Sequence, residues 1–292
     1  MSRRDTVMQF LDSDGLGLEI GPSHNPVAPK REGFRVEIID HLSQEELLEK
    51  YRDHKLRLDR IESVDYVWNG ETYSELTGKT KHYDWVIASH LIEHTPDLIE
   101  FLNGCAEVLK DDGVLSLVIP DKRYCFDHFR PLSSLGQVID AHVQKRVQHT
   151  SGTLTDYFLN VVHLNEQGAW DSGSQGQYSF VHSIDQARSF ITQDSKQESY
   201  TDVHAWCFVP HSFRLLIDDL NNLGLIQIKE IGFTNTKENE FYISLGREGT
   251  GSGLSRLELQ QRIELELKEQ LQGKSSHPLR RVARKLLRAL GR

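Results

Sequence analysis

The sequence predicts an α/β fold built on a doubly wound, mostly parallel sheet with an antiparallel end. Over residues 15–120, short apolar runs typical of strands alternate with segments of helical periodicity. Residues 83–120 read as strand, helix and strand, a βαβ unit that implies parallel strands and a right-handed crossover. Residues 225–246 then contain two strands that are close enough in sequence to pair antiparallel.

The N-terminal part supplies three strands and one helix of this fold. The first strand is expected over residues 15–21, an apolar run closed by glycine, and the second over residues 34–40. Ser43 and Glu46 have the spacing of a capping box, so a helix is expected to begin directly after Ser43. A weaker third strand covers residues 63–68 and stops at an Asn-Gly pair.

The βαβ unit has the clearest pattern in the chain. Its first strand is expected over residues 83–88. Thr95 has the form of an N-cap with proline at the first helical position, and apolar residues then recur at helical spacing. The Asp-Asp-Gly sequence at 111–113 is expected to end this helix, and the next strand covers residues 114–119.

The remainder of the chain is less regular. Residues 121–205 are polar and irregular, rich in histidine and aromatic side chains. A helix over 210–223 follows, and then two antiparallel strands over 225–233 and 240–246, joined through Asn235. These elements close the predicted domain.

The expected domain covers residues 1–247 and contains residues 121–205 as an insertion. Glycine and serine dominate residues 248–253, which predicts a flexible linker, and residues 254–292 form a helical tail. The second tail segment, 278–290, places leucines on one face and arginines on the other. A basic amphipathic helix at a chain end is typical of a membrane-surface or partner-docking element, here including a glycosyltransferase partner. The first segment, 254–272, has the composition of a short self-association helix.

Charge and cysteine content exclude several classes of protein. The 292 residues include 34 Lys+Arg and 43 Asp+Glu, a formal charge of −9, which argues against a nucleic-acid-binding body. Residues 274–292 contain seven Lys+Arg and no acidic residue, which leaves 27 against 43, or −16, on residues 1–273. Three scattered cysteines fit a reducing compartment. Without a signal peptide or a membrane-spanning run, the protein is expected in the cytoplasm, with the tail able to place it on the inner membrane face.

Three features lie at the carboxyl ends of the predicted strands, where doubly wound sheets bind ligands. Glu19 and Gly21 close the first strand, and a glycine there lets a ligand approach the backbone. Asp40 ends the second strand about 20 residues later, where a carboxylate can accept hydrogen bonds from both hydroxyls of an adenosine ribose. The third feature is the Ser-His-Leu-Ile-Glu-His sequence at 89–94, directly after the fourth strand.

With these motifs in order over residues 14–120, the chain resembles the class I S-adenosylmethionine-dependent methyltransferases. It is most similar to a subgroup with an EIGPxxNP-type first motif and an SHxxEH segment, associated with glycan and polysaccharide biosynthesis. The resemblance implies a seven-stranded Rossmann-like sheet with an antiparallel last strand, and S-adenosylmethionine as cofactor. One departure is visible, because the family's glycine-rich loop keeps only its first glycine here. Prolines at 22, 26 and 29 would also interrupt a helix after that loop.

The resemblance assigns cofactor contacts residue by residue. It implies that the end of the first strand shapes the methionine pocket, that Asp40 binds ribose, and that Leu42 packs on the adenine. The residues expected to bind the cofactor are Glu19, Gly21, Pro22, Asp40, Leu42, Asn69, Gly70, Ser89 and His90.

Transfer of a methyl group to a sugar hydroxyl requires removal of the hydroxyl proton by a nearby histidine or carboxylate. Asp121 and His128 follow the fifth strand and His204 precedes the last helix of the domain, so these three are the candidate catalytic residues. An irregular insertion of roughly 85 residues is uncommon unless functional, so residues 121–205 are expected to bind the acceptor as a lid. The residues expected to bind the acceptor are Arg123, Tyr124, Arg130, His163, His182 and Trp206.

No metal is expected from the sequence. His90 and His94 have helical metal-ligand spacing but lack the glutamate of the zinc-protease motif, and His94 is expected to pack or cap at the helix start.

The expected function is S-adenosylmethionine-dependent O-methylation of a sugar hydroxyl in a polysaccharide, a glycan or its precursor. Two alternatives stay open. One is an NAD- or nucleotide-sugar-dependent oxidoreductase, against which stand the missing G-x-G-x-x-G sequence and the antiparallel final strands. The other is a non-catalytic, cofactor-binding scaffold for a glycosyltransferase complex.

Overall fold

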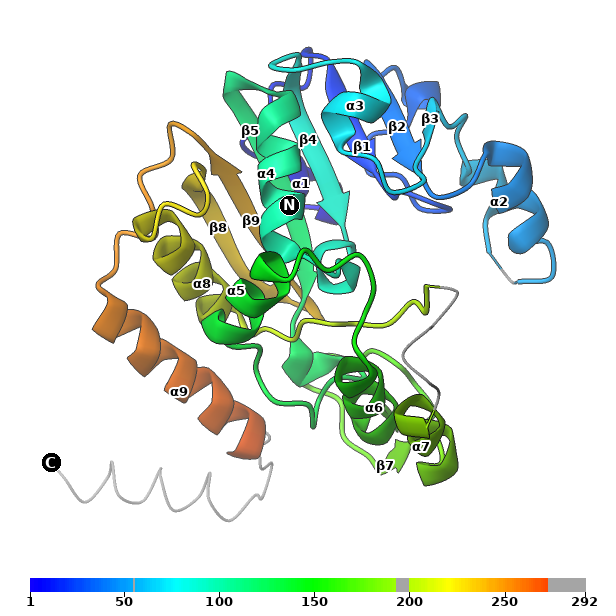
Figure 1. Ribbon diagram of the computed structural model, residues 1–292, viewed down its shortest axis with the longest axis vertical. Helices are drawn as coiled ribbons and strands as arrows, with labels where there is room; N and C mark the ends of the chain where they lie inside the picture. The colour runs from blue at the N-terminus through cyan, green and yellow to red at the C-terminus, as the bar shows by residue number, and fades with distance from the viewer. Residues whose placement is uncertain (55, 193–199, 273–292) are drawn as a thin grey trace, which may run out of the picture.

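The computed structural model describes residues 1–54, 56–192 and 200–272, and its seven-stranded sheet confirms the predicted fold class (Figure 1). The strand order is β3-β2-β1-β4-β5-β9-β8, in which β1 to β5 are parallel and β9 is antiparallel to both of its neighbours. The strands are β1 (Gly17–Ile20), β2 (Val36–Asp40), β3 (Tyr66–Val67), β4 (Tyr83–Ser89), β5 (Leu109–Pro120), β8 (Lys229–Lys237) and β9 (Glu240–Gly246).

The strand order places a ligand crevice at one edge of the sheet. The chain runs outward from β1 to β3 and then returns to β4, which pairs with the other side of β1. In doubly wound sheets, the carboxyl ends of the two strands at such a reversal leave a crevice that binds ligands. The site is therefore expected where β1 and β4 end.

Alternating side chains on the strands pack against two different layers. From β4, Val86 and Ala88 contribute to the larger core, which also contains buried residues of α4, α5 and α8. Trp85 and Ile87 point to the opposite face, where the N-terminal helix and the chain around Val27 cover the sheet. The helices named so far and the remaining short ones are α1 (Arg3–Met8), α2 (Gln44–Lys50), α3 (Tyr73–Thr77), α4 (Leu98–Val108), α5 (Leu135–Val143), α8 (Pro210–Asn222), η1 (Lys30–Glu32), η2 (Leu58–Arg60), η3 (Ile92–His94) and η4 (Lys122–Tyr124).

The predicted start of α2 is confirmed, and the predicted start of α4 is corrected. The capping box at Ser43 forms as expected and begins α2. The N-cap of α4, however, is Asp97, whose carboxylate accepts the Glu100 N–H at 3.0 Å. The Thr95 hydroxyl instead donates to the Ile92 carbonyl and closes η3. The helix also ends at Val108, because β5 begins at Leu109, which pairs with Tyr83; the ladder is irregular until Val114 pairs with Trp85.

The 121–205 segment contains more regular structure than its composition indicated. Besides α5, it forms α6 (Ser151–Asn160), α7 (Ile184–Thr192) and a two-stranded sheet of β6 (Val162–Leu164) and β7 (Tyr178–Phe180). Figure 1 shows α6, α7 and β7 together beyond the arrowheads of the parallel strands. The insertion therefore stands over the edge at which the crevice lies.

The C-terminal part of the described chain is packed against the domain. The turn between β8 and β9 lies at residues 238–239 rather than at Asn235. The expected flexible linker is held by hydrogen bonds: the Gly251 N–H donates to the Glu230 carbonyl, and the Ser252 carbonyl accepts from Arg214. It leads to α9 (Arg256–Gln272), which packs on α8.

Residues 274–292, the predicted docking tail, lie outside the described residues, which end with α9 at residue 272. Among the residues that the structure describes, no helix is long and apolar enough to cross a membrane.

One carboxylate, that of Glu240, joins three parts of the fold. It lies at the start of β9 and accepts from the Arg3 guanidinium of α1 at 2.7 Å and from the His90 imidazole after β4 at 2.6 Å. Burial alone would raise the pKa of Glu240, but the bonds from His90 and Arg3 outweigh it and lower the pKa to about 2.

A substitution tests this contribution through its pH dependence. A carboxylate whose pKa falls on folding stabilises the fold above its unfolded pKa of 4.5, and this stabilisation is lost as pH falls towards 2. We expect Glu240→Gln to lower the free energy of unfolding by about 3 kcal/mol at pH 7 and to have little effect near pH 2. Urea unfolding at several pH values measures this. The exposed Glu248→Gln is the control, and an equal loss at all pH values would contradict the assignment.

Candidate active site

The turn after β1 is built around a glycine and a buried carboxylate. Gly21 has a φ of 66°, and a Cβ atom there would lie 3.1 Å from Leu91. Glu19 is 1% exposed, and its two oxygens accept the N–H groups of Val27 and Ala28 at 2.7 and 3.1 Å. Burial raises the pKa of Glu19 to about 7, although these two donors oppose the shift. The loop therefore keeps its shape through Glu19, where the family's usual loop relies on more glycines.

Asp40 lies beside this turn at the end of β2. Its carboxylate is buried and accepts from the Ser23 N–H at 2.8 Å and from the N–H and Nδ1 of His41 at 2.8 and 2.7 Å. The His41 side chain is 48% exposed, so its imidazole can move aside without disturbing the core. Asp40 thus lies buried at the carboxyl end of β2, next to the turn after β1, which is the position predicted from the sequence.

The end of β4 forms the opposite wall. Ser89 accepts a hydrogen bond from Arg3 at 2.7 Å, and His90 follows with a φ of 53°. Few residues other than glycine adopt such a φ, which marks a strained turn next to the site. The His90 imidazole lies between Glu240 and Glu93, which together raise its pKa to about 9 against the effect of burial.

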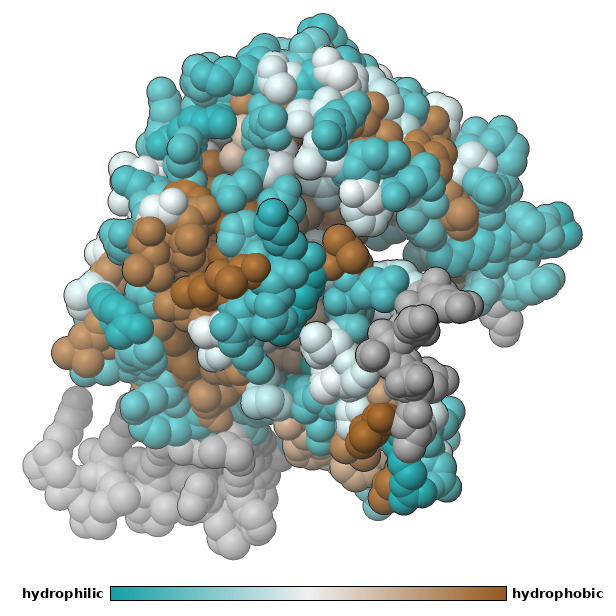
Figure 2. Space-filling model, viewed as in Figure 1, coloured by the Kyte–Doolittle hydropathy of each residue, from teal (hydrophilic) through white to brown (hydrophobic). Residues whose placement is uncertain are grey.

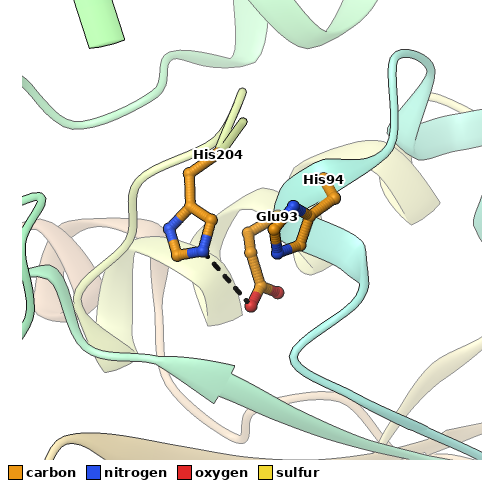
Figure 3. Close-up of side chains that lie close together, drawn as sticks. All are labelled: Glu93, His94 and His204. Atoms are coloured by element: carbon orange, nitrogen blue, oxygen red, sulfur yellow. Dashed lines mark ion pairs between the residues drawn. The ribbon is translucent and has the colours of Figure 1, made fainter. Parts of the chain in front are cut away.

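Beyond this turn, Glu93, His94 and His204 form a compact cluster (Figure 3). One ligating atom from each lies within 4.8 Å of those of the other two. The Glu93 side chain is fully buried and points between the two imidazoles, with its Oε1 atom 3.9 Å from the His204 Nε2 atom. Burial would raise the pKa of the Glu93 carboxyl, but the imidazoles of His90 and His204 lower it below its usual value.

Two further carboxylates hold the histidines of this cluster. The His204 Nδ1 atom lies 2.5 Å from Asp127, and the His94 Nδ1 atom lies 2.8 Å from Asp202. Asp127 is itself buried and accepts from Arg130 at 2.8 Å, which with His204 lowers the pKa of Asp127 to about 2 despite burial. The backbone adds a direct link, because the Glu93 carbonyl accepts the Ala205 N–H at 2.7 Å.

Of the predicted catalytic residues, His204 lies in this cluster and the other two lie apart from it. The Asp121 carboxylate is fully buried and accepts from Arg123 and from the Thr236 hydroxyl. Both nitrogens of His128 are also occupied, by the Arg123 carbonyl at 2.8 Å and the Tyr178 hydroxyl at 3.2 Å. In these contacts the polar atoms of Asp121 and His128 are engaged by other residues of the protein.

The predicted acceptor-binding residues are divided in the same way. Arg123 pairs with Asp121, Arg130 pairs with Asp127 and donates to the His204 carbonyl, and the Trp206 indole donates to the Thr95 carbonyl. These three side chains are buried; Arg130 and Trp206 contact the backbone next to the cluster, whereas Arg123 holds Asp121. Tyr124, His163 and His182 are half-buried within the insertion, and His182 packs against Phe158.

The remaining predicted cofactor residues follow the carboxyl ends of the first three strands: Pro22 after β1, Leu42 after β2, and Asn69 and Gly70 after β3. Pro22 and Leu42 are half-buried, and Asn69 and Gly70 are exposed in the turn after β3. Figure 2 shows the surface notched between the lobe that carries α2 and the part of the insertion that carries α6 and α7. The notch lies where the carboxyl ends of the parallel strands open to solvent.

The loop at β1 gives a second prediction. Gln offers one acceptor oxygen where Glu19 offers two, so Glu19→Gln leaves one buried N–H without a partner. We expect this substitution to lower the free energy of unfolding by about 1–3 kcal/mol and to speed amide exchange at Val27 and Ala28. Chemical denaturation and amide hydrogen exchange measure the two effects. The exposed Glu45→Gln is the matched control, and unchanged exchange at both amides would contradict the role of Glu19.

Comparisons with solved structures give weak likenesses. A Streptomyces caelestis CcbJ methyltransferase has 10% identity and a TM-score of 0.42, over 84% of this chain and 96% of that one. A SAM-dependent methyltransferase from Aquifex aeolicus has 11% identity and a TM-score of 0.38, over 83% and 88%. A Rhodobacter sphaeroides protein described as a zinc-dependent alcohol dehydrogenase has 13% identity and a TM-score of 0.44, over 84% and 89%. With TM-scores below 0.5, these likenesses carry no inference about activity.

Sequence comparison is more informative. No curated protein sequence matches the chain. The sequence profile of a methyltransferase-domain family matches residues 3–157, which is more than half of the 292 residues and includes β1 to β5. The chain therefore belongs to the methyltransferase-domain family.

Proposed function

We propose that this methyltransferase transfers the methyl group of its cofactor, S-adenosylmethionine, to a sugar hydroxyl of a polysaccharide, a glycan or its precursor. The observation that carries the acceptor proposal is the buried Glu93, His94 and His204 cluster at the carboxyl edge of the sheet. A carboxylate and two imidazoles are suited to activating a hydroxyl, which is a poor nucleophile until its proton is removed.

The residues at the ends of β1 and β2 fit the cofactor. A carboxylate accepts about four hydrogen bonds, and Asp40 accepts three within the protein, one of them from the exposed His41 imidazole. If that imidazole moves aside, Asp40 can accept from both ribose hydroxyls. Gly21 has no side chain, and a Cβ atom there would lie only 3.1 Å from Leu91 of the opposite wall, so glycine keeps the space between the two walls open. Asp40 and Gly21 would therefore hold the nucleoside.

The cofactor supplies a methyl group bonded to a positively charged sulfur, so much of the acceleration comes from positioning the two reactants in line. Leu91 lies beside the glycine turn, 3.1 Å from where a Cβ atom of residue 21 would be, and precedes Glu93 by two residues in the chain. The same short segment therefore connects the cofactor side of the crevice to the cluster. An acceptor hydroxyl bound at the cluster would face the cofactor across this segment.

The insertion offers surfaces suited to a sugar ring. Phe129, Tyr178 and Phe180 are between 42% and 65% exposed, and Tyr178 is stacked on His128. Sugars present apolar C–H faces to aromatic rings and hydroxyl groups to polar side chains, and ligand sites commonly combine these two features. We propose residues 121–205 as the acceptor-binding lid on this basis. Mass spectrometry of cell-surface polysaccharide with and without the protein tests the acceptor class.

The central test separates cofactor binding from transfer. We expect Glu93→Gln and His204→Ala to lower methyl transfer by about 10²–10⁴-fold and to change S-adenosylhomocysteine affinity by less than about threefold, because neither residue lies at the β1 and β2 ends. Calorimetry and a radiolabelled methyl-transfer assay measure the two quantities. His82→Ala, before the start of β4, is the control.

Two results would reject the proposal. Tight NAD binding without any response to S-adenosylhomocysteine would indicate an oxidoreductase. Normal glycan methylation in cells that carry both substitutions would indicate a scaffold.

We further propose that the basic segment 274–292 docks on an anionic membrane surface or on a glycosyltransferase, and that α9 contributes to self-association. The seven positive charges of 274–292 support the membrane alternative. We expect deletion of 274–292 to abolish sedimentation with anionic vesicles and to leave S-adenosylhomocysteine binding unchanged. Neutral vesicles are the control. Equal sedimentation of the shortened and full-length chains would exclude membrane docking by this segment.

A further inference from the structure

We propose that Glu93, His94 and His204 bind one divalent transition-metal ion. The three donors come from two segments, the turn after β4 and the segment before α8, and they approach within 4.8 Å of one another (Figure 3). Two imidazoles and one carboxylate are a common ligand set for first-row metals such as zinc, manganese, iron and cobalt. Magnesium and calcium prefer oxygen ligands and are poorer candidates.

The Glu93 carboxylate provides the strongest support. Its side chain is fully buried, yet neither oxygen accepts a hydrogen bond from any residue that the structure describes. Burial of an ionised carboxylate is costly unless a charge and hydrogen bonds compensate for it. A cation between Glu93 and the two imidazoles would provide that compensation.

The histidines are oriented as metal ligands usually are. Each holds its Nδ1 atom against a carboxylate, His204 on Asp127 and His94 on Asp202. A histidine that donates from Nδ1 carries the lone pair on Nε2, the atom that faces the cluster. Carboxylate–histidine–metal arrangements of this kind fix the ring and its tautomer in many metal sites. Arg130 in turn donates a hydrogen bond to Asp127 and fixes the carboxylate that orients His204.

Protonated imidazoles are the competing way to compensate Glu93. One of them, His90, places its Nδ1 atom 3.5 Å from the Glu93 Oε1 atom and supplies part of that charge without a hydrogen bond. A protonated His204 Nε2 would be expected to donate to Glu93 at about 2.7–2.9 Å, the usual length of a charge-assisted bond. The observed separation is 3.9 Å, which is too long for that bond. It is near the spacing of two ligands of one ion, because bonds of about 2.1 Å in tetrahedral geometry separate donors by about 3.4 Å. Binding would require a pair that is 4.8 Å apart to approach by about 1.4 Å.

The proposed metal site is open to solvent on one side, and an ion bound there could act on the acceptor hydroxyl. The His94 side chain is 26% exposed and Asp202 is 70% exposed, so an ion can reach the cluster from that side. A cation there would polarise an acceptor hydroxyl and make its proton easier to remove. This catalytic role rests on the proposed function, whereas metal binding itself does not.

Metal binding can be measured without any methyl transfer. The untagged, full-length chain is stripped with a chelator, and Zn²⁺, Mn²⁺ and Co²⁺ are titrated separately by calorimetry, with Mg²⁺ as comparison. We expect one ion per chain for at least one transition metal, and visible absorption bands for bound Co²⁺. Glu93→Gln and His94→Ala should each lower the affinity at least 100-fold. Asp202→Asn, at an exposed supporting residue, should lower it about 10–100-fold.

His82→Ala is the control for binding to surface histidines and should leave the affinity unchanged. Circular dichroism of each variant shows whether it folds, and the exposed Asp202→Asn variant keeps the test valid if a buried variant does not. Absence of stoichiometric binding, or equal affinity in the Glu93→Gln, His94→Ala and Asp202→Asn variants, would overturn the metal site. Metal binding by a chain that methylates no sugar would reject only the proposed function. Full methyl transfer by the metal-free chain would reject only the catalytic role of the ion.

Discussion

The carboxyl edge of the sheet is arranged around one constraint, a buried glutamate whose carboxylate accepts no hydrogen bond from the described part of the chain. Glu93 lies one turn beyond β4, and charges gather around it: His90 before it, His94 after it and His204 from the far end of the insertion. Its backbone carbonyl also fixes the segment that carries His204. The buried negative charge of Glu93 therefore requires compensation, and the Glu93 backbone positions His204, one of the groups that can provide it. The insertion is joined to the sheet at this point.

Most of the fold follows from local patterns in the sequence. Apolar runs located β1, β2, β4 and β5, and the capping box located α2, because burial and cap chemistry act within a few residues. Local sequence patterns were less reliable where a neighbouring residue or a distant contact determined the structure. Thr95 resembles an N-cap, but its hydroxyl closes η3 and Asp97 begins the helix. The glycine-rich 249–253 segment resembles a free linker, but contacts from Arg214 and Glu230 fix it.

The positions of the residues at the ends of β1 and β2 could be predicted from the sequence, and the arrangement of the Glu93, His94 and His204 cluster only in part. Glu19, Gly21 and Asp40 lie at strand ends, so spacing along the chain determines where they meet. Glu93 and His94 stand next to each other in the sequence, but His90 suggested the wrong pair, because it turns away to Glu240. Asp127 had no local signal. Its role depends on His204, which is 77 residues away and becomes its neighbour only after the insertion folds back.

The late insertion of β9 into the sheet has a consequence for synthesis of the chain. β9 pairs between β5 and β8, yet it begins 120 residues after β5 ends. At about 5–20 residues per second, a ribosome needs about 6–24 s to make that interval. For that time the outer edge of β5 has no partner strand, and an unpaired apolar edge is a template for association with other chains. A chaperone that shields nascent β5 would therefore be expected to improve the yield of this protein.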